Sequence, residues 1–163
     1  DFIVGTALKE PDVNFIAIER VSDVLVSAAE KVFARELRNV KVCCIDADAL
    51  PDRFKEGSID RIYLNFSDPW PKSRHYKRRL TYRGFLDIYN RLLKDDGAIF
   101  FKTDNRGLFD FSIEEFKAKD FRLHNLTYDL HNSEYNDENI TTEYERRFSA
   151  MGYAINRVEA YKK

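Results

Sequence analysis

Residues 65–72 combine the residue types in this chain that could carry chemistry. The segment reads Asn-Phe-Ser-Asp-Pro-Trp-Pro-Lys and follows residues 59–64, which alternate as a β-strand does. Its two prolines cannot continue strand pairing, so Asp68 is expected just beyond the end of a strand. Ligands of open α/β sheets bind there, and an acid beside an aromatic ring can face a flat, hydrogen-bonding molecule such as a nucleobase. Taken alone, these residues are equally compatible with a capped turn that buries Trp70.

Three more predicted strands end in an acid. They are residues 14–19, 40–45 and 98–101, and the acids are Glu19, Asp46 and Asp104. Because the carboxyl ends of parallel strands lie on one edge of a sheet, these carboxylates are expected to converge with Asp68 on one crevice. Like charges brought together cost stability unless a ligand or cation partners them. The pattern therefore favours a binding site over four unrelated helix caps.

Helices and strands are predicted to alternate along the chain. Apolar residues at helical spacing indicate helices at 21–37, 81–94, 108–119 and 143–150, with the tail of another at 1–9, and two further strands at 121–130 and 153–161. This order predicts a mostly parallel α/β sheet with right-handed crossovers, closed by an antiparallel hairpin. The 163 residues are expected to form a single domain, 1–163.

Two local features carry structural expectations. Ser22 is expected to cap the helix that starts beside it. The run 40–45 is almost entirely apolar, which is typical of a parallel strand buried on both faces. The adjacent Cys43 and Cys44 are therefore expected to be reduced core residues, since no second cysteine pair exists to complete a zinc site.

Composition indicates an ordinary globular protein. Hydrophobic residues make up 44% of the chain and charged residues 34%, and 27 basic against 28 acidic residues leave a formal charge of −1. This balance favours no class of partner. No apolar run approaches the roughly 20 residues that a membrane helix needs, and no secretory signal is visible, which favours a cytoplasmic protein without a membrane partner.

Charge is nevertheless distributed unevenly. Residues 72–83 contain no acid and include Lys72, Arg74, Lys77, Arg78, Arg79 and Arg83, interleaved with His75, Tyr76 and Tyr82. Such a segment can contact phosphates while its aromatic rings stack on bases, so nucleic acid is favoured over a solvated loop. Residues 123–145 contain no lysine or arginine and are not expected to follow a phosphate backbone. Their end, 142–145, could offer acceptors to a base edge or form a capping box.

The acids at the ends of the predicted strands 14–19 and 40–45 could bind a nucleoside. A carboxylate can accept hydrogen bonds from both hydroxyls of a ribose, which makes Glu19 the candidate, with Asp46 near the adenine end. Sites of this kind have a glycine-rich turn after their first strand, and no Gly-x-Gly occurs here. The turn and a central first strand are therefore expected upstream of Asp1.

Several motifs together resemble those of the bacterial tRNA (guanine-N7)-methyltransferases, which modify guanine 46 in the variable loop. They are residues 65–72, Arg74-His75, Lys77-Arg78-Arg79-Leu80, Lys102-Thr103-Asp104 and Thr142-Glu143-Tyr144-Glu145. The resemblance covers essentially the whole chain in the right order. The sequence differs from the family pattern at its amino-terminal end, where the family's glycine-rich motif and the basic segment before it are absent.

The resemblance implies a Rossmann-like class I S-adenosylmethionine-dependent methyltransferase fold with a seven-stranded sheet, its first strand lying upstream. It implies that Glu19, Asp46 and Asp68 contact S-adenosylmethionine, with Asp68 catalytic and no metal. Residues implied to contact the tRNA are Lys72, Asp104, Thr142, Glu143, Tyr144 and Glu145.

The chemistry narrows the role of Asp68. Guanine N7 carries a lone pair and no proton, so its attack on a sulfonium methyl needs no base. We therefore expect Asp68 to orient the purine and stabilise its developing positive charge, with general-base work secondary.

Two alternative functions are also compatible with these residues. Ser-Asp-Pro-Trp is also similar to the motif of methyltransferases acting on amino groups of adenine or cytosine, and the chain could be a non-catalytic tRNA-binding module.

Overall fold

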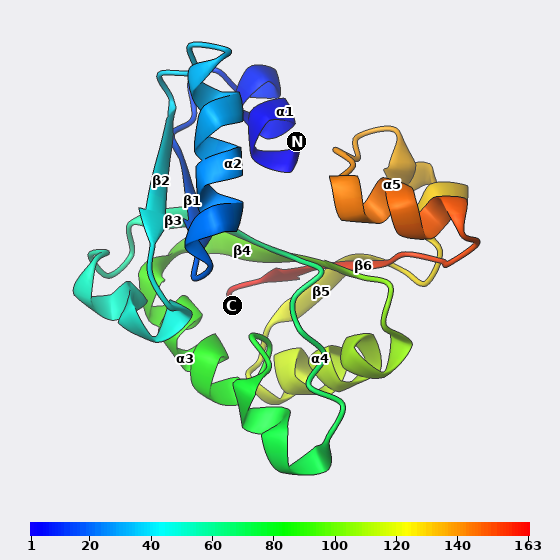
Figure 1. Ribbon diagram of the computed structural model, residues 1–163. Coiled ribbons are helices and arrows are strands. Elements are labelled where there is room, and N and C mark those ends of the chain that lie inside the picture. The colour runs from blue at the N-terminus through cyan, green and yellow to red at the C-terminus, as the bar shows by residue number, and fades with distance from the viewer.

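The computed structural model describes residues 1–163 and has six strands and five α-helices (Figure 1). In chain order these are α1 (Phe2–Lys9), β1 (Phe15–Glu19), α2 (Ser22–Phe33), β2 (Val40–Cys44), β3 (Ile59–Asn65), α3 (Arg83–Leu92), β4 (Leu93–Thr103), α4 (Arg106–Ala118), β5 (Arg122–Thr127), α5 (Glu143–Ala150) and β6 (Asn156–Tyr161). Short 3-10 turns lie between them, at η1 (Ala47–Asp52), η2 (Ser73–Arg78), η3 (Leu130–Asn132) and η4 (Glu134–Asn136). None of the helices combines the length and apolar character needed to cross a bilayer.

The strands form two separate sheets. Strands β1 and β2 pair in parallel, and the other sheet has the order β3-β4-β6-β5, with β3 parallel to β4 and β6 antiparallel to both of its neighbours. The predicted alternation, parallel pairing and antiparallel last hairpin are confirmed. The seven-stranded sheet is not confirmed: the six strands of residues 1–163 divide between two ladders, and no pairing joins β1 to β3.

Side chains of α1 and β3 connect the two sheets. The ring of Phe2 lies edge-on to that of Tyr63, with centroids 5.3 Å apart. Arg61 Nη1 donates to Glu10 Oε1 at 2.9 Å beside this contact. Tyr63 also packs against the small core under β1 and β2, which consists of Val4, Ala7, Phe15, Val32 and Val40. These contacts link the smaller sheet to the larger one.

The main core lies between the four-stranded sheet and helices α3 and α4. Phe101 of β4 is fully buried and stacks on Phe109 of α4, with ring centroids 6.0 Å apart. Helix α4 begins sharply because Asn105 Oδ1 accepts from the Leu108 N–H at 2.8 Å, which satisfies one of the free donors of its first turn. This cap follows directly on the carboxyl end of β4 and fixes where that strand stops.

Two local expectations are wrong. Strand β2 is an edge strand with a largely uncovered outer face, so Cys44 is exposed and Cys43 half-buried instead of lying in the core. Ser22 does not cap α2, because Val21 occupies the N-cap position and its N–H donates to Glu19 Oε1 at 2.9 Å. Strand β6 also begins later than the expected residue 153, and it is a central strand of its sheet with most of its residues buried.

Replacing Phe109 by Ala should lower the free energy of unfolding by about 3–5 kcal/mol, because the truncation leaves a cavity in the main core. Urea titration followed by circular dichroism measures this loss. Phe33→Ala is the matched control, since Phe33 is 85% exposed, and it should change stability by no more than about 0.5 kcal/mol. Equal losses in the two variants would contradict this assignment of the core.

Candidate functional site

The carboxyl ends of β3 and β4 lie side by side. Asn65 and Lys102 are partners in the parallel ladder, and the Phe66 N–H donates to the Lys102 carbonyl at 2.9 Å. The loop of residues 66–72 therefore leaves the sheet beside Asp104. Asp68 is exposed, and its side chain makes no hydrogen bond or ion pair within the protein. Its carboxylate is available to a ligand.

A third segment joins these two from the far end of the chain. The ring of Tyr144, at the start of α5, packs against that of Phe66 with centroids 4.9 Å apart. Partial burial raises the pKa of the Tyr144 phenol, and the neighbouring negative charge of Asp104 raises it further. The structure thus brings together residues 66–72, Asp104 and the first turn of α5, which the sequence separates widely.

Residues 142–145 form the capping box that the sequence left as one of two possibilities. Thr142 Oγ1 accepts from the Glu145 N–H at 2.9 Å, and Glu145 Oε2 accepts in return from the Thr142 N–H at 3.4 Å. Glu145 is fully buried, whereas Glu143 and Tyr144 are exposed and Thr142 half-buried. In this conformation Glu145 presents no acceptor to a ligand.

The loop of residues 66–72 is conformationally unusual. Phe66 and Trp70 have positive φ angles of 54° and 42°, a region that side chains other than glycine seldom occupy. The Ser67 hydroxyl is buried and has no hydrogen-bond partner. Strained backbone and an unpaired polar atom persist only where surrounding contacts enforce them, and they gather at functional sites.

Arg79 is the contact that enforces this loop conformation. Its guanidinium donates from Nε to the Pro69 carbonyl at 3.0 Å and from Nη2 to the Trp70 carbonyl at 3.2 Å. The same group lies over the ring of Phe111 on α4, 4.4 Å from its centroid. Arg79 therefore holds the loop on the body of the protein, a role that the sequence did not indicate.

The basic segment divides into structural and free residues. Arg83 pairs with Glu115 at 2.7 Å, so both Arg79 and Arg83 are engaged within the protein. The other four basic residues are exposed and form no salt bridge, and they are Lys72, Arg74, Lys77 and Arg78. Arg78 lies over the ring of Trp70, 5.0 Å from its centroid. Four of the six basic residues therefore form an exposed basic surface next to Asp68, and this surface is smaller than the sequence suggested.

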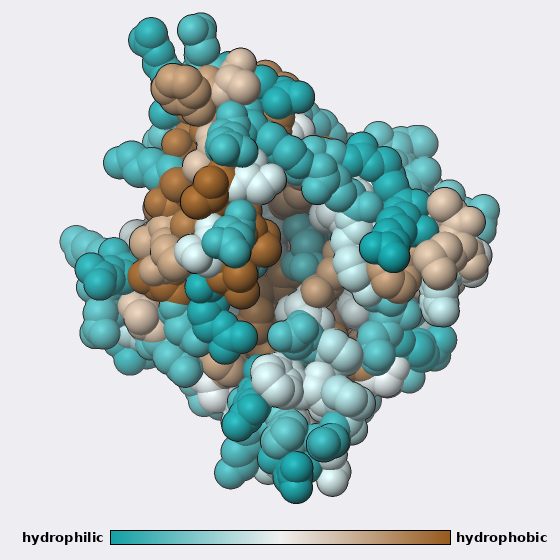
Figure 2. Space-filling model, viewed as in Figure 1, coloured by the Kyte–Doolittle hydropathy of each residue, from teal (hydrophilic) through white to brown (hydrophobic).

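Glu19 and Asp46 occupy the carboxyl edge of the smaller sheet. Glu19 is the register partner of Cys44, which places it close to Asp46. One Glu19 oxygen accepts from the Val21 N–H, and Arg20 lies 3.9 Å from Asp46 Oδ2. The four predicted acids thus occur as two pairs, one at the end of each sheet. Figure 2 shows a hollow in this face of the molecule between α2 and α5.

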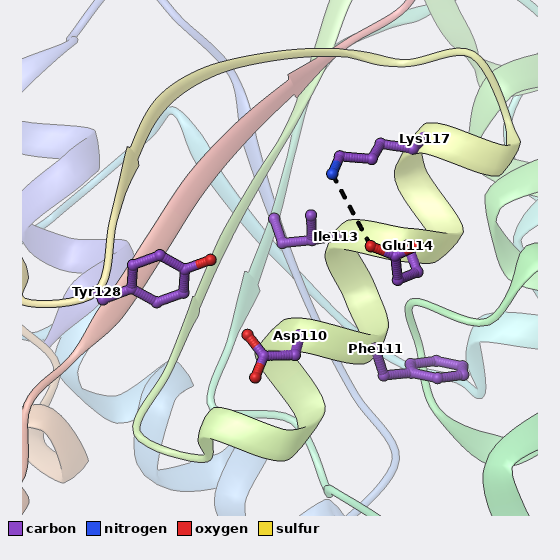
Figure 3. Close-up of a pocket in the computed structure, with 6 residues that line it drawn as sticks. All are labelled: Asp110, Phe111, Ile113, Glu114, Lys117 and Tyr128. Atoms are coloured by element: carbon purple, nitrogen blue, oxygen red, sulfur yellow. Dashed lines mark ion pairs between the residues drawn. The ribbon is translucent and has the colours of Figure 1, made fainter.

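A separate open cavity of about 430 Å³ lies along α4, lined by Asp110, Phe111, Ile113, Glu114, Lys117 and Tyr128. Figure 3 shows Tyr128 opposite Asp110 and the ion pair between Lys117 and Glu114 at its rim. None of the predicted site residues lines this cavity. We therefore do not assign the site to it.

Comparisons with solved structures define the class of fold. The chain superposes on an antibiotic-related methyltransferase with a TM-score of 0.70 at 18% identity, covering 98% of this chain and 80% of that one. It also matches a protein from Streptococcus mutans described as "a putative methyltransferase" in complex with SAH, with a TM-score of 0.59 at 14% identity, covering 92% of this chain and 76% of that one. The fold is that of S-adenosylmethionine-dependent methyltransferases, as predicted.

Sequence comparisons define the family. Residues 1–158 match the family model described as "Putative methyltransferase". The chain is 51% identical over 159 residues to a tRNA (guanine-N(7)-)-methyltransferase of Streptococcus pyogenes serotype M6, covering 98% of this chain and 75% of that protein. The same figures hold for the protein of serotype M1. The chain belongs to the tRNA (guanine-N7)-methyltransferase family.

Replacing Asp104 by Asn should lower the pKa of the Tyr144 phenol towards its ordinary value, because the neighbouring negative charge that disfavours phenolate is removed. The part of the shift that comes from burial should remain. NMR titration of protein labelled at tyrosine Cζ measures this pKa, with Tyr144→Phe assigning the signal. Asp110→Asn removes an exposed acid elsewhere and should leave the pKa unchanged. An unaltered titration in Asp104→Asn would show that the two side chains are not neighbours.

Proposed function

We propose that this protein transfers a methyl group from S-adenosylmethionine to N7 of a guanine in tRNA, at position 46 of the variable loop. Membership of the family supports the reaction. The observation that carries the assignment to a site is the contact of Phe66 with Tyr144 beside Asp104, because it joins three distant motifs at the strand ends.

The methyl donor is proposed to lie along Glu19 and Asp46. The donor supplies an electrophilic methyl group on a sulfonium sulfur. Glu19 has one oxygen fixed by the Val21 N–H, which orients the carboxylate and leaves the other oxygen for a ribose hydroxyl. Asp46 is about half exposed on the neighbouring strand end and can accept from the adenine side. These residues fit a nucleoside, because both place acceptors at adjacent carboxyl ends of parallel strands.

Asp68 is proposed to act by position and charge. Guanine N7 loses no proton as it attacks the methyl group, so the reaction requires no base at this atom. Positive charge moves from the sulfur to the purine, and a carboxylate fixed nearby stabilises it more in the transition state than in the ground state. The exposed, unpaired carboxylate of Asp68 on a constrained loop suits that role.

Asp104 and Tyr144 are proposed to receive the guanine. The Watson–Crick edge of guanine presents N1–H and the exocyclic amine as donors, which match a carboxylate acceptor such as Asp104. Tyr144 is 42% exposed and offers ring surface to a base pulled from its stack. Thr142 and Glu143 precede Tyr144 at the start of the same helix and are proposed to contact the tRNA with it. Glu145 belongs to the proposed site through its contact with Lys102.

The exposed basic residues of 72–78 are proposed to hold the phosphates around the target. Lys72, Arg74, Lys77 and Arg78 have no acidic partner within the protein. Lysine and arginine that neutralise phosphates release counterions, so their contribution to binding should depend on salt. Trp70, beneath Arg78, is proposed to support this surface.

Incubation with labelled S-adenosylmethionine and a tRNA transcript carrying guanine at position 46 should yield 7-methylguanosine after digestion to nucleosides. A transcript with adenine at position 46 is the control and should yield none. Formation of N6-methyladenosine or a methylated cytosine amine would replace the proposed reaction with amino-group methylation. Binding of tRNA without transfer or donor affinity would favour the non-catalytic binding module.

Replacing Lys72 and Arg74 together by Ala should weaken tRNA binding and reduce the slope of log K against log salt by about 1.4–1.8, if each contacts one phosphate. Affinity for S-adenosylmethionine should stay unchanged. Filter binding at several salt concentrations measures the slope, and Lys41→Ala with Lys55→Ala removes the same charge at exposed remote positions as a control. A parallel fall in donor affinity would assign the segment to the donor instead.

A further inference from the structure

Helix α5 is attached to the protein in an unusual way. Its only buried residue is a charged one, Glu145, which is 0% exposed. The remaining residues of α5 are exposed or half-buried, so apart from the contact of the Tyr144 ring with Phe66 the helix is not fixed on an apolar core. Figure 1 shows α5 above β6, on the side of the four-stranded sheet away from α3 and α4. The buried contacts that hold α5 in place are therefore those of Glu145.

Lys102, near the end of β4, provides the main contact. Its ammonium group donates to Glu145 Oε2 at 2.7 Å, to Asn139 Oδ1 at 2.9 Å and to the Ile140 carbonyl at 3.1 Å. The other Glu145 oxygen, Oε1, contacts His131 Nε2 at 2.8 Å and accepts from Asn139 Nδ2 at 2.7 Å. All three donors of the lysine and both oxygens of the glutamate are thus engaged.

The hydrogen bonds to Lys102 and Glu145 offset the cost of burying their two charges. The Lys102 side chain is 8% exposed, so both charges have been taken out of water. Burial lowers the pKa of Lys102, an effect that its bond to Glu145 opposes. Burial alone would raise the pKa of Glu145, but hydrogen bonds from Lys102, His131 and Asn139 outweigh it and leave that pKa lowered. Removing either charge would leave the other buried without a partner, which is strongly destabilising.

The pair is placed where it can control the substrate side of the site. Lys102 lies two residues before Asp104, and Glu145 directly follows Tyr144. The pair therefore ties together the two backbones that carry these proposed guanine contacts. The other charged ties of α5, from Lys31 to Glu143 and from Arg146 to Asp1, lie on the surface, where such pairs contribute little.

We propose that Lys102 and Glu145 are positioning residues that hold Tyr144 against Asp104, and that Glu145 acts through Lys102 without touching the tRNA. This inference rests on the proposed function. It replaces the expectation that Glu145 binds substrate directly, and it adds Lys102, Asn139 and His131 to the groups that shape the site.

Steady-state kinetics with tRNA test the proposal, using Lys102→Met, Glu145→Gln and the double variant. Each single variant should lower kcat/KM for tRNA at least tenfold and leave the Kd for S-adenosylmethionine within twofold. The double variant should lose no more than the worse single one, because both changes remove the same contact. If Glu145→Gln loses activity while Lys102→Met retains it, or if the two losses multiply, Glu145 acts on its own and the proposal is overturned.

A second double variant, Lys102→Met with Glu145→Met, separates positioning from stability. An apolar pair of similar volume commonly stabilises as well as a buried ion pair, so its unfolding midpoint should match or exceed those of the single variants. It cannot donate to Ile140 or accept from Asn139, and kcat/KM should remain low. Recovery of both stability and activity would show that the pair serves the fold alone.

Limited trypsin digestion gives a readout that does not depend on the reaction. Arg146 and Arg147 on α5 are exposed cleavage sites, and Lys102→Met should accelerate cleavage there without changing cleavage in the main core. Lys94→Met and Asp60→Asn break an exposed pair of 2.6 Å and should leave the pattern unchanged. Unaltered cleavage in Lys102→Met overturns the anchor. Accelerated cleavage, in a protein whose wild type does not methylate tRNA, would uphold the anchor and reject the proposed function.

Discussion

The ion pair between Lys102 and Glu145 is the contact on which the proposed substrate side of this protein depends. Two charges are buried together, and their cost is offset only because surrounding amide and carbonyl groups complete the coordination of both. An apolar contact could slide by a fraction of an ångström at little cost, whereas these hydrogen bonds admit one geometry. Helix α5, whose only buried residue is Glu145, is thereby held at a defined distance from β4.

The rest of the site follows from the end of the parallel pair β3 and β4. Their register sets residues 66–72 next to Asp104, and Arg79 keeps that loop in a conformation that Phe66 and Trp70 would not adopt freely. Tyr144 then closes on Phe66 from α5. The arrangement places a free carboxylate, an aromatic ring and a basic surface together, which is what recognition of a guanine within a charged nucleic acid requires.

The strands, the helices and the acids at the strand ends could be predicted from the sequence, whereas the side-chain contacts that join them could not. Strand and helix positions could be predicted because apolar periodicity is local, and Asp68 and Asp104 stood out because each follows a strand. The burial of Glu145 could not be predicted, since an acid within a polar segment ordinarily faces water and its partner Lys102 lies 43 residues away. Arg79 counted as part of a phosphate-binding run because its bonds to Pro69 and Trp70 arise only once the loop folds. The exposure of Cys44 depends on sheet order, which periodicity does not reveal.

Hydrogen–deuterium exchange of the protein with and without tRNA tests most directly whether these segments form one substrate site. The account predicts that tRNA slows exchange in residues 66–78 and in residues 142–147 together, while the cavity along α4, residues 110–117, exchanges as before. Protection confined to only one of the two segments, or centred on α4, would contradict it.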